Sequence, residues 1–134
     1  MLEYKISASS EKGGTARAEA KKSKISFDAA AESGDQYPNP AELYLSSFAA
    51  CILKNVERYS HILRIPYERA YIKVKGWRSD VPPAMVKVEY ILTIVSNEED
   101  HKVDLIHRNV QKFGTIYNTV AKSCEVSGTM IHQK

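Results

Sequence analysis

Residues 39–64 carry the strongest helix signal in the chain. Asn39 suits an N-cap, Pro40 suits the first helical position, and Glu42 stands three residues after the cap, which together make an asparagine version of the capping box. The helix should end before Pro66, because proline moves the preceding residue out of the helical region. Apolar residues recur at helical spacing and predict a core-facing stripe of Leu45, Phe48, Ala49, Ile52, Val56, Tyr59 and Leu63.

A second helix is predicted over residues 97–123. Asn97 is the expected cap, and acidic residues fill the first turn, where they complement the helix dipole. Gly114 should weaken this helix only modestly. Its apolar stripe consists of Val103, Ile106, Val110, Phe113, Tyr117 and Val120.

The remaining segments alternate between apolar and polar residues or are bounded by turn residues, as strands are. Gly13 and Gly14 supply a tight reversal, and residues 29–38 read as a loop. The predicted strands span residues 2–10, 15–28, 68–80, 84–96 and 124–133. The order β-β-α-β-β-α-β predicts one α+β domain over residues 1–134, with a curved sheet around a buried central helix.

The composition excludes several classes of function. A chain of 134 residues with 43% hydrophobic and 26% charged residues is ordinary for a soluble domain. The net charge of +3 is spread along alternating strands, which does not favour a nucleic-acid site. No apolar run is long enough to span a membrane, and the N-terminal residues do not resemble a signal peptide. Two cysteines do not make a disulfide scaffold, so a cytoplasmic protein with reduced thiols is expected.

The other residue types that carry chemistry show no ligand or cofactor pattern. The four histidines lack metal-ligand spacing, no Cys-x-x-Cys occurs, and glycine-rich phosphate loops are absent. His61 is ten residues from Cys51 on the same predicted helix, or about 15 Å along the axis, which is out of hydrogen-bond reach. We therefore expect no metal and no cofactor.

Cys51 is the one candidate nucleophile on the central helix. It lies about a quarter turn from the centre of the apolar stripe, and Lys54 and Arg58 follow it on the same side. Cationic neighbours favour the thiolate, which is the reactive form. On spacing alone a structural core cysteine is the favoured interpretation, since free cysteine is among the most buried residue types.

The stretch NPAELYLSSFAAC, residues 39–51, resembles the OsmC/Ohr family. In that family Asn-Pro or Ser-Pro, then Glu-Leu, then a small-residue run ending in Ala-Cys opens the buried central helix. The resemblance extends over the whole chain and its element order. It implies an OsmC-like fold, an intertwined homodimer, and reduction of organic hydroperoxides. By this resemblance Cys51 is the peroxidatic thiol, a second cysteine resolves its sulfenic acid, and an external dithiol clears the disulfide.

The family's second cysteine can be placed in two registers. In one, CEVS matches Cys-Pro-Val-Ser and Cys124 is the partner; in the other, YNTV matches Tyr-Cys-x-Val and Asn118 replaces the cysteine. We favour the second register, because it keeps the family separation and leaves room for the last strand. For Glu42, helix capping is favoured over catalysis. Arg17 is the nearest candidate for the family's arginine, and a surface position on its strand is the alternative.

The first function hypothesis is therefore a thiol-dependent peroxidase acting on organic hydroperoxides in oxidative stress defence. Cys51 is the nucleophile, Lys54, Arg58 or Arg17 favours its thiolate, and Cys124 or an external thiol resolves the sulfenic acid. The alternatives are a non-catalytic OsmC-like dimer that binds a small molecule, and a one-cysteine redox sensor. The expected partners are a second copy of the chain, the hydroperoxide and a dithiol reductant, with no nucleic acid and no membrane.

Overall fold

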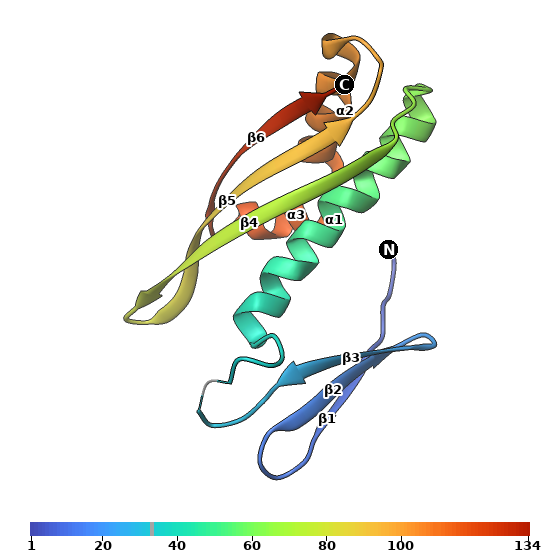
Figure 1. Ribbon diagram of the computed structural model, residues 1–134. Helices are drawn as coiled ribbons and strands as arrows, with labels where there is room; N and C mark the ends of the chain where they lie inside the picture. The colour runs from blue at the N-terminus through green and yellow to red at the C-terminus, as the bar shows by residue number, and fades with distance from the viewer. Residues whose placement is uncertain (33) are drawn as a thin grey trace. The chain divides into compact units, whose positions relative to one another are not determined.

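The computed structural model describes residues 1–32 and 34–134 (Figure 1). The chain divides into two compact units, Met1–Tyr44 and Leu45–Lys134, and each is described by itself. The single domain expected over residues 1–134 stays a prediction. Within the described ranges, no helix is both long and apolar enough to cross a membrane.

The N-terminal unit contains a three-stranded antiparallel sheet. Strands β1 (Ser7–Ser10), β2 (Thr15–Ala20) and β3 (Ser23–Asp28) pair in the order β1-β2-β3. The reversal predicted at Gly13 and Gly14 is confirmed, because both have a φ of 99°, which glycine adopts without steric cost. The predicted loop 29–38 is described except for residue 33.

The single strand predicted over residues 15–28 is wrong, because this segment is the β2–β3 hairpin. Ala20 pairs with Ser23, so Lys21 and Lys22 form a two-residue turn. Lys21 has a φ of 55°, which turns of this length usually assign to glycine or asparagine. Two lysines carry no such turn signal, and the pattern on either side reads as one continuous strand.

Helix α1 (Pro40–Leu63) matches the predicted helix 39–64 to within one residue at each end. The capping box is confirmed by two hydrogen bonds. The Asn39 N–H donates to Glu42 Oε1 at 3.1 Å, and the Glu42 N–H donates to Asn39 Oδ1 at 2.8 Å. The helix ends as Arg64 takes a φ of 55°, a left-handed residue of the kind that commonly closes helices.

The buried face of α1 is rotated from the predicted stripe towards Cys51. Three stripe positions, Phe48, Ile52 and Val56, are fully buried as predicted. The other four stripe positions are only partly buried. Cys51 and Asn55 complete the buried set of α1. A polar side chain on this face was not predicted, since residue type alone places asparagine at the surface.

The C-terminal unit is built on a second three-stranded sheet, in the order β4-β5-β6. Strands β4 (Arg69–Asp80) and β5 (Pro83–Val95) are antiparallel, whereas β5 and β6 (Glu125–Gln133) are parallel (Figure 1). The parallel pair needs a crossover, which the segment between β5 and β6 supplies. Four alternate residues of β5 are buried in the core: Val88, Tyr90, Leu92 and Ile94.

The second predicted helix is wrong as one element, because it breaks at Gly114. It forms α2 (Asp100–Phe113) and α3 (Thr115–Ala121), and Gly114 between them is extended, with φ −67° and ψ 120°. The cap predicted at Asn97 is also wrong, since α2 begins after Glu99. A Cβ at Gly114 would lie 3.0 Å from the Val110 carbonyl oxygen. The low helix propensity of glycine and the crowding around this position both accompany the break.

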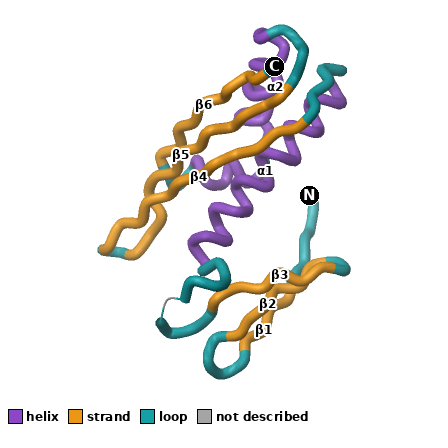
Figure 2. The backbone as a smooth tube through the Cα atoms, in the orientation of Figure 1, coloured by secondary structure: helices purple, strands orange, loops and turns teal. Residues whose placement is uncertain are grey.

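The α+β class is confirmed, with a different count of elements. The described residues form six strands and three helices, against five strands and two helices predicted, and the strands belong to two separate sheets. The Tyr90 side chain of β5 contacts Phe48 of α1, His107 of α2 and Tyr117 of α3. All three helices therefore cover the same face of the β4-β5-β6 sheet (Figure 2).

Candidate functional site

The Cys51 thiol lies where α1 meets the break between α2 and α3. The residue is 9% exposed, and its Sγ atom would lie 3.1 Å from a Cβ built on Gly114. A side chain at this position would crowd the sulfur. The helix break at Gly114 therefore lies against the thiol.

Asn55 is the polar neighbour of this thiol. One helical turn after Cys51, it is 7% exposed. Its Nδ2 donates to the Cys51 carbonyl oxygen at 2.8 Å and lies 3.6 Å from Cys51 Sγ. Among the described residues, Asn55 Oδ1 is the one buried side-chain nitrogen or oxygen without a hydrogen-bond partner. The sequence places Asn55 near Cys51 but contains no signal that its amide is buried.

An aromatic cluster adjoins the thiol. Phe48, one turn before Cys51, stacks on Tyr117 with ring centroids 5.5 Å apart and contacts the edge of Tyr90 at 5.8 Å. Tyr117 also contacts Tyr90, with ring centroids 6.2 Å apart. A Cβ built on Gly114 would lie 3.1 Å from the Tyr117 Cβ, the same distance as from the Cys51 sulfur. Two of the three helices and the central strand thus supply an apolar surround for the thiol.

Polar side chains contact the aromatic cluster at the Tyr90 hydroxyl. The Tyr90 hydroxyl lies 2.7 Å from His107 Nε2 and accepts a hydrogen bond from Gln111 Nε2 at 3.3 Å. Burial raises the pKa of Tyr90 above its ordinary value. Burial also lowers the pKa of His107, against the smaller opposing effect of Asp104. His107 is therefore a neutral, buried hydrogen-bonding group at pH 7.

The predicted cationic partners of the thiol are exposed residues of their own elements. Lys54 and Arg58 are exposed on α1. Arg17 lies on β2 in the N-terminal unit, half exposed, with its Nε 3.3 Å from the Glu19 carboxylate. This is a surface ion pair, of a kind that contributes little to stability.

Glu42 is held by the helix cap. Its carboxylate accepts the Asn39 N–H, so the capping role favoured from the sequence is present. Cys51 follows Glu42 by nine positions on α1, which corresponds to about 13 Å along the axis.

Asn118 lies in the middle of α3, whereas Cys124 follows its C-terminal end. Cys124 is 7% exposed just beyond α3, and its Sγ donates to the Met85 carbonyl oxygen at 3.3 Å. Both cysteines are free thiols. Cys51 faces Gly114 before α3, so a helix of seven residues, about 10 Å long, lies between the two thiol positions. Asn118 is exposed, and its Nδ2 donates to the Lys112 carbonyl oxygen at 3.1 Å.

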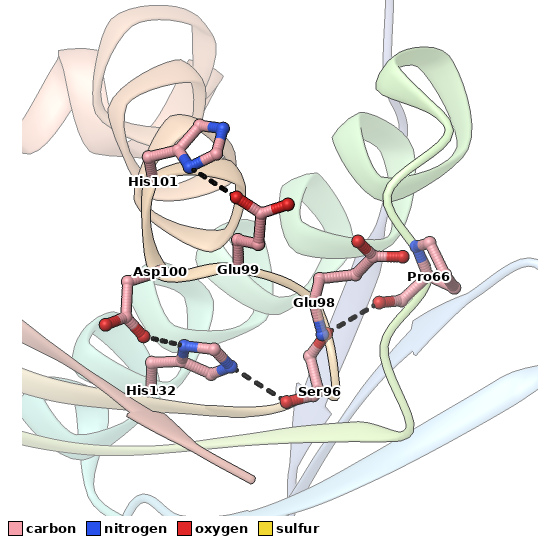
Figure 3. Close-up of polar contacts among 7 residues, drawn as sticks. All are labelled: Pro66, Ser96, Glu98, Glu99, Asp100, His101 and His132. Carbon is pink, nitrogen blue, oxygen red and sulfur yellow. Dashed lines mark hydrogen bonds and ion pairs between the residues drawn. The ribbon is translucent and has the colours of Figure 1, made fainter.

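A second polar cluster joins the ends of the C-terminal unit (Figure 3). The buried His132 ring of β6 has Nδ1 2.5 Å from Asp100 Oδ1 and Nε2 2.8 Å from the Ser96 carbonyl oxygen. Ser96 Oγ donates to the Pro66 carbonyl oxygen at 2.8 Å. No three His, Cys, Asp or Glu side chains in the described ranges are grouped to hold a metal ion. We interpret this cluster as a structural connection.

The fold and the site define a class of α+β protein with a buried thiol on a long helix packed against a mixed sheet. The family model for OsmC-like protein matches residues 33–128. The chain therefore belongs to the OsmC-like protein family, as the stretch at residues 39–51 indicated. Among curated proteins, none matches the sequence significantly.

Solved structures of this family share the fold. The OsmC-like protein from Mycoplasma pneumoniae is 19% identical with a TM-score of 0.88, covering 99% of each chain. An organic hydroperoxide resistance protein OsmC from Legionella pneumophila is 14% identical with a TM-score of 0.73, covering 98% of this chain and 99% of that one. The organic hydroperoxide resistance protein OhrB of Bacillus subtilis is 16% identical with a TM-score of 0.66, covering 95% and 98%.

Proposed function

We propose that this protein is a thiol-dependent peroxidase that reduces organic hydroperoxides through Cys51. The observation that carries the proposal is the buried thiol itself, enclosed by α1, the Gly114 break and the aromatic cluster, with the Asn55 amide 3.6 Å from the sulfur. Two observations support the choice of substrate class: the chain belongs to the OsmC-like family, and the similar Legionella and Bacillus proteins are organic hydroperoxide resistance proteins.

The first step is a two-electron transfer to the peroxide. The Cys51 thiolate attacks the oxygen of ROOH that carries hydrogen, the S–O bond forms, and the O–O bond breaks. Cysteine is oxidised to the sulfenic acid Cys–S–OH, and the alkoxide RO⁻ takes a proton to leave as the alcohol. An apolar surround suits the organic group R.

The second step needs a thiol, and we propose an external dithiol. Its first sulfur attacks the Cys51 sulfur and releases water, which leaves a mixed disulfide. Its second sulfur then displaces Cys51 as a free thiol, so the dithiol leaves as a cyclic disulfide. The position of Cys124 beyond the far end of α3 favours this route over resolution within the chain, because a disulfide needs Cα atoms within about 7 Å.

The test is consumption of cumene hydroperoxide by the purified protein with excess dithiothreitol. We expect wild-type turnover to exceed the reductant's background and Cys51→Ser to reduce it to that background. Cys124→Ser should keep most of the wild-type rate, whereas its inactivation would make Cys124 the resolving thiol. A wild type no faster than Cys51→Ser would remove the peroxidase proposal and favour the small-molecule-binding alternative.

The same proposal includes a homodimer and a cytoplasmic location. The dimer rests on the family resemblance, and light scattering of the purified protein tests it. A reducing compartment agrees with two free thiols. Arg17 and Glu42 are retained as proposed partners of the thiol on the resemblance alone, and Arg17→Ala in the cumene hydroperoxide assay tests the first of them.

A further inference from the structure

The carboxamide of Asn55 is only half satisfied. Its Nδ2 is bonded to the Cys51 carbonyl oxygen at 2.8 Å, whereas its Oδ1 is buried with no donor among the described residues. A buried carbonyl oxygen without a partner costs roughly 1–3 kcal/mol, and such groups are rare in folded proteins. This atom lies in the side chain that faces the Cys51 sulfur.

The orientation of the amide follows from its neighbour. The Cys51 carbonyl oxygen can only accept a hydrogen bond, so the atom 2.8 Å from it must be the nitrogen. The other terminal atom is then the oxygen. A flipped amide would place two acceptors against each other. The unpartnered group of this side chain is therefore an acceptor, and a ligand that completes it must bring a donor.

A hydroperoxide carries the donor that this acceptor lacks. Its single O–H is on the oxygen that the thiolate attacks. Oδ1 belongs to the same carboxamide as Nδ2, which lies 3.6 Å from Cys51 Sγ, so we infer that a bond from that O–H to Oδ1 brings the reacting oxygen towards the sulfur. The sulfenic acid formed by the attack keeps this hydrogen on the transferred oxygen, so the same acceptor serves substrate and product. Alcohols, water and carboxylic acids share the donor but lack the O–O bond.

We propose that Asn55 is a substrate-positioning residue of the Cys51 site, whose Oδ1 accepts the O–H of the hydroperoxide. This inference rests on the proposed function and deepens it. Asn55 lies beside Cys51 because residues four apart are neighbours on the same face of α1. The Nδ2 bond to the Cys51 carbonyl fixes the orientation of the side chain.

The test compares two reagents in three proteins. Cumene hydroperoxide oxidises Cys51 and has the O–H donor, whereas methyl methanethiosulfonate modifies thiolates and has no donor. The proteins are wild type, Asn55→Leu and Asn109→Leu. Asn109 is the matched control, because its Nδ2 makes the same hydrogen bond to a carbonyl four residues earlier, that of Leu105, at 2.9 Å on α2. Modification of Cys51 is followed by peptide mass spectrometry, with dimedone trapping the sulfenic acid.

We expect Asn55→Leu to slow peroxide oxidation roughly tenfold or more, as for loss of a hydrogen bond in the transition state, and to change methanethiosulfonate modification less than about threefold. Asn109→Leu should change neither rate. Equal losses with both reagents would overturn the inference, because Asn55 would then act on the thiol or the packing alone. Unchanged peroxide oxidation in Asn55→Leu would overturn it while leaving the peroxidase proposal intact. A wild-type Cys51 that reacts with methanethiosulfonate but not with the hydroperoxide would overturn both.

A second measurement serves if Asn55→Leu does not fold. In Cys51→Ala the hydroperoxide can bind but cannot be reduced by this residue. Titration with cumene hydroperoxide should shift the side-chain NH₂ resonances of Asn55 to saturation and leave those of Asn109 unchanged. Absence of a shift at Asn55, or equal shifts at both asparagines, would overturn the inference.

Discussion

At the scale of single residues, burial determines how two polar side chains in the core of the C-terminal unit form hydrogen bonds. Asn55 and His107 are polar residues on the buried faces of α1 and α2, and both contribute a hydrogen bond there. Asparagine and histidine are mostly found at or near the surface, so residue type could not predict this burial. Their environments differ, because His107 is paired with the Tyr90 hydroxyl whereas Asn55 keeps one acceptor free.

His107 should make stability depend on pH. Burial holds its folded-state pKa below the unfolded value of 6.5, so below about pH 6.5 the unfolded chain binds a proton that the native state does not. The free energy of unfolding should therefore fall as pH is lowered through that value, at up to about 1.4 kcal/mol per pH unit. Above pH 7 this contribution is fully present.

The measurement is urea unfolding of wild type and His107→Gln at pH 7.5 and pH 5. Groups that titrate in both proteins cancel in the difference between them, and the Asp104 carboxylate is present in both. We expect the wild type's advantage over His107→Gln to shrink at pH 5. An advantage that grows at pH 5 would mean that the buried ring gains its proton in the folded state.

At the scale of elements, local signals and packing account for different boundaries. Helix α1 begins where its cap predicts, because Asn39 and Glu42 satisfy each other's backbone N–H groups. The break between α2 and α3 instead lies where the Cys51 sulfur of α1 packs against Gly114. The first boundary is a property of four consecutive residues, whereas the surroundings of the second come from another helix.

The Glu42→Gln variant tests whether Glu42 acts only in the helix cap or also in catalysis. Glutamine also completes a capping box, so this variant should unfold within about 0.5 kcal/mol of wild type, whereas Glu42→Ala should lose about 1 kcal/mol. Thermal unfolding measures both. We expect the Glu42→Gln protein to keep its cumene hydroperoxide activity, and an inactive but equally stable variant would assign the carboxylate a part in the chemistry.

The β2–β3 turn should be improved by glycine at one position only. Lys21 has a φ of 55°, where a side chain costs about 1 kcal/mol. Lys21→Gly should therefore raise the free energy of unfolding by about 0.5–1 kcal/mol, less the extra entropy of the unfolded glycine. Lys22→Gly is the matched control, since Lys22 has no positive φ, and it should be neutral or destabilising. Equal gains from both variants would contradict the turn geometry.

At the scale of the whole molecule, the C-terminal unit is closed by contacts between segments far apart in the chain. His132 near the end of β6 reaches Asp100 at the start of α2 and the Ser96 carbonyl after β5 (Figure 3). These bonds tie the parallel strand to the crossover that makes the parallel pairing possible. The alternation over residues 124–133 predicted the strand, but the histidine's partners depend on the assembled sheet.

Removing this connection should destabilise the unit. His132→Ala leaves the Ser96 carbonyl without its donor and opens a buried position, so we expect a loss of about 2–3 kcal/mol in urea unfolding. His101→Ala is the control, because His101 pairs with Glu99 in an exposed contact at 3.4 Å and should change stability by less than about 0.5 kcal/mol. Similar losses in the two variants would show that the His132 bonds contribute no more than a surface pair.

The sequence by itself determined the bounds of α1, the alternation of β4 and β5, the α+β class and the family, because these depend on residues close together in the chain. Only the tertiary structure decided the β2–β3 turn, the break at Gly114 and the burial of the Asn55 amide beside Cys51. The turn is local but carries no turn residue, whereas the surroundings of Gly114 and of Asn55 depend on segments from different parts of the chain meeting. Periodicity shows which face of a helix is apolar, whereas the group that a thiol faces depends on what packs against that face.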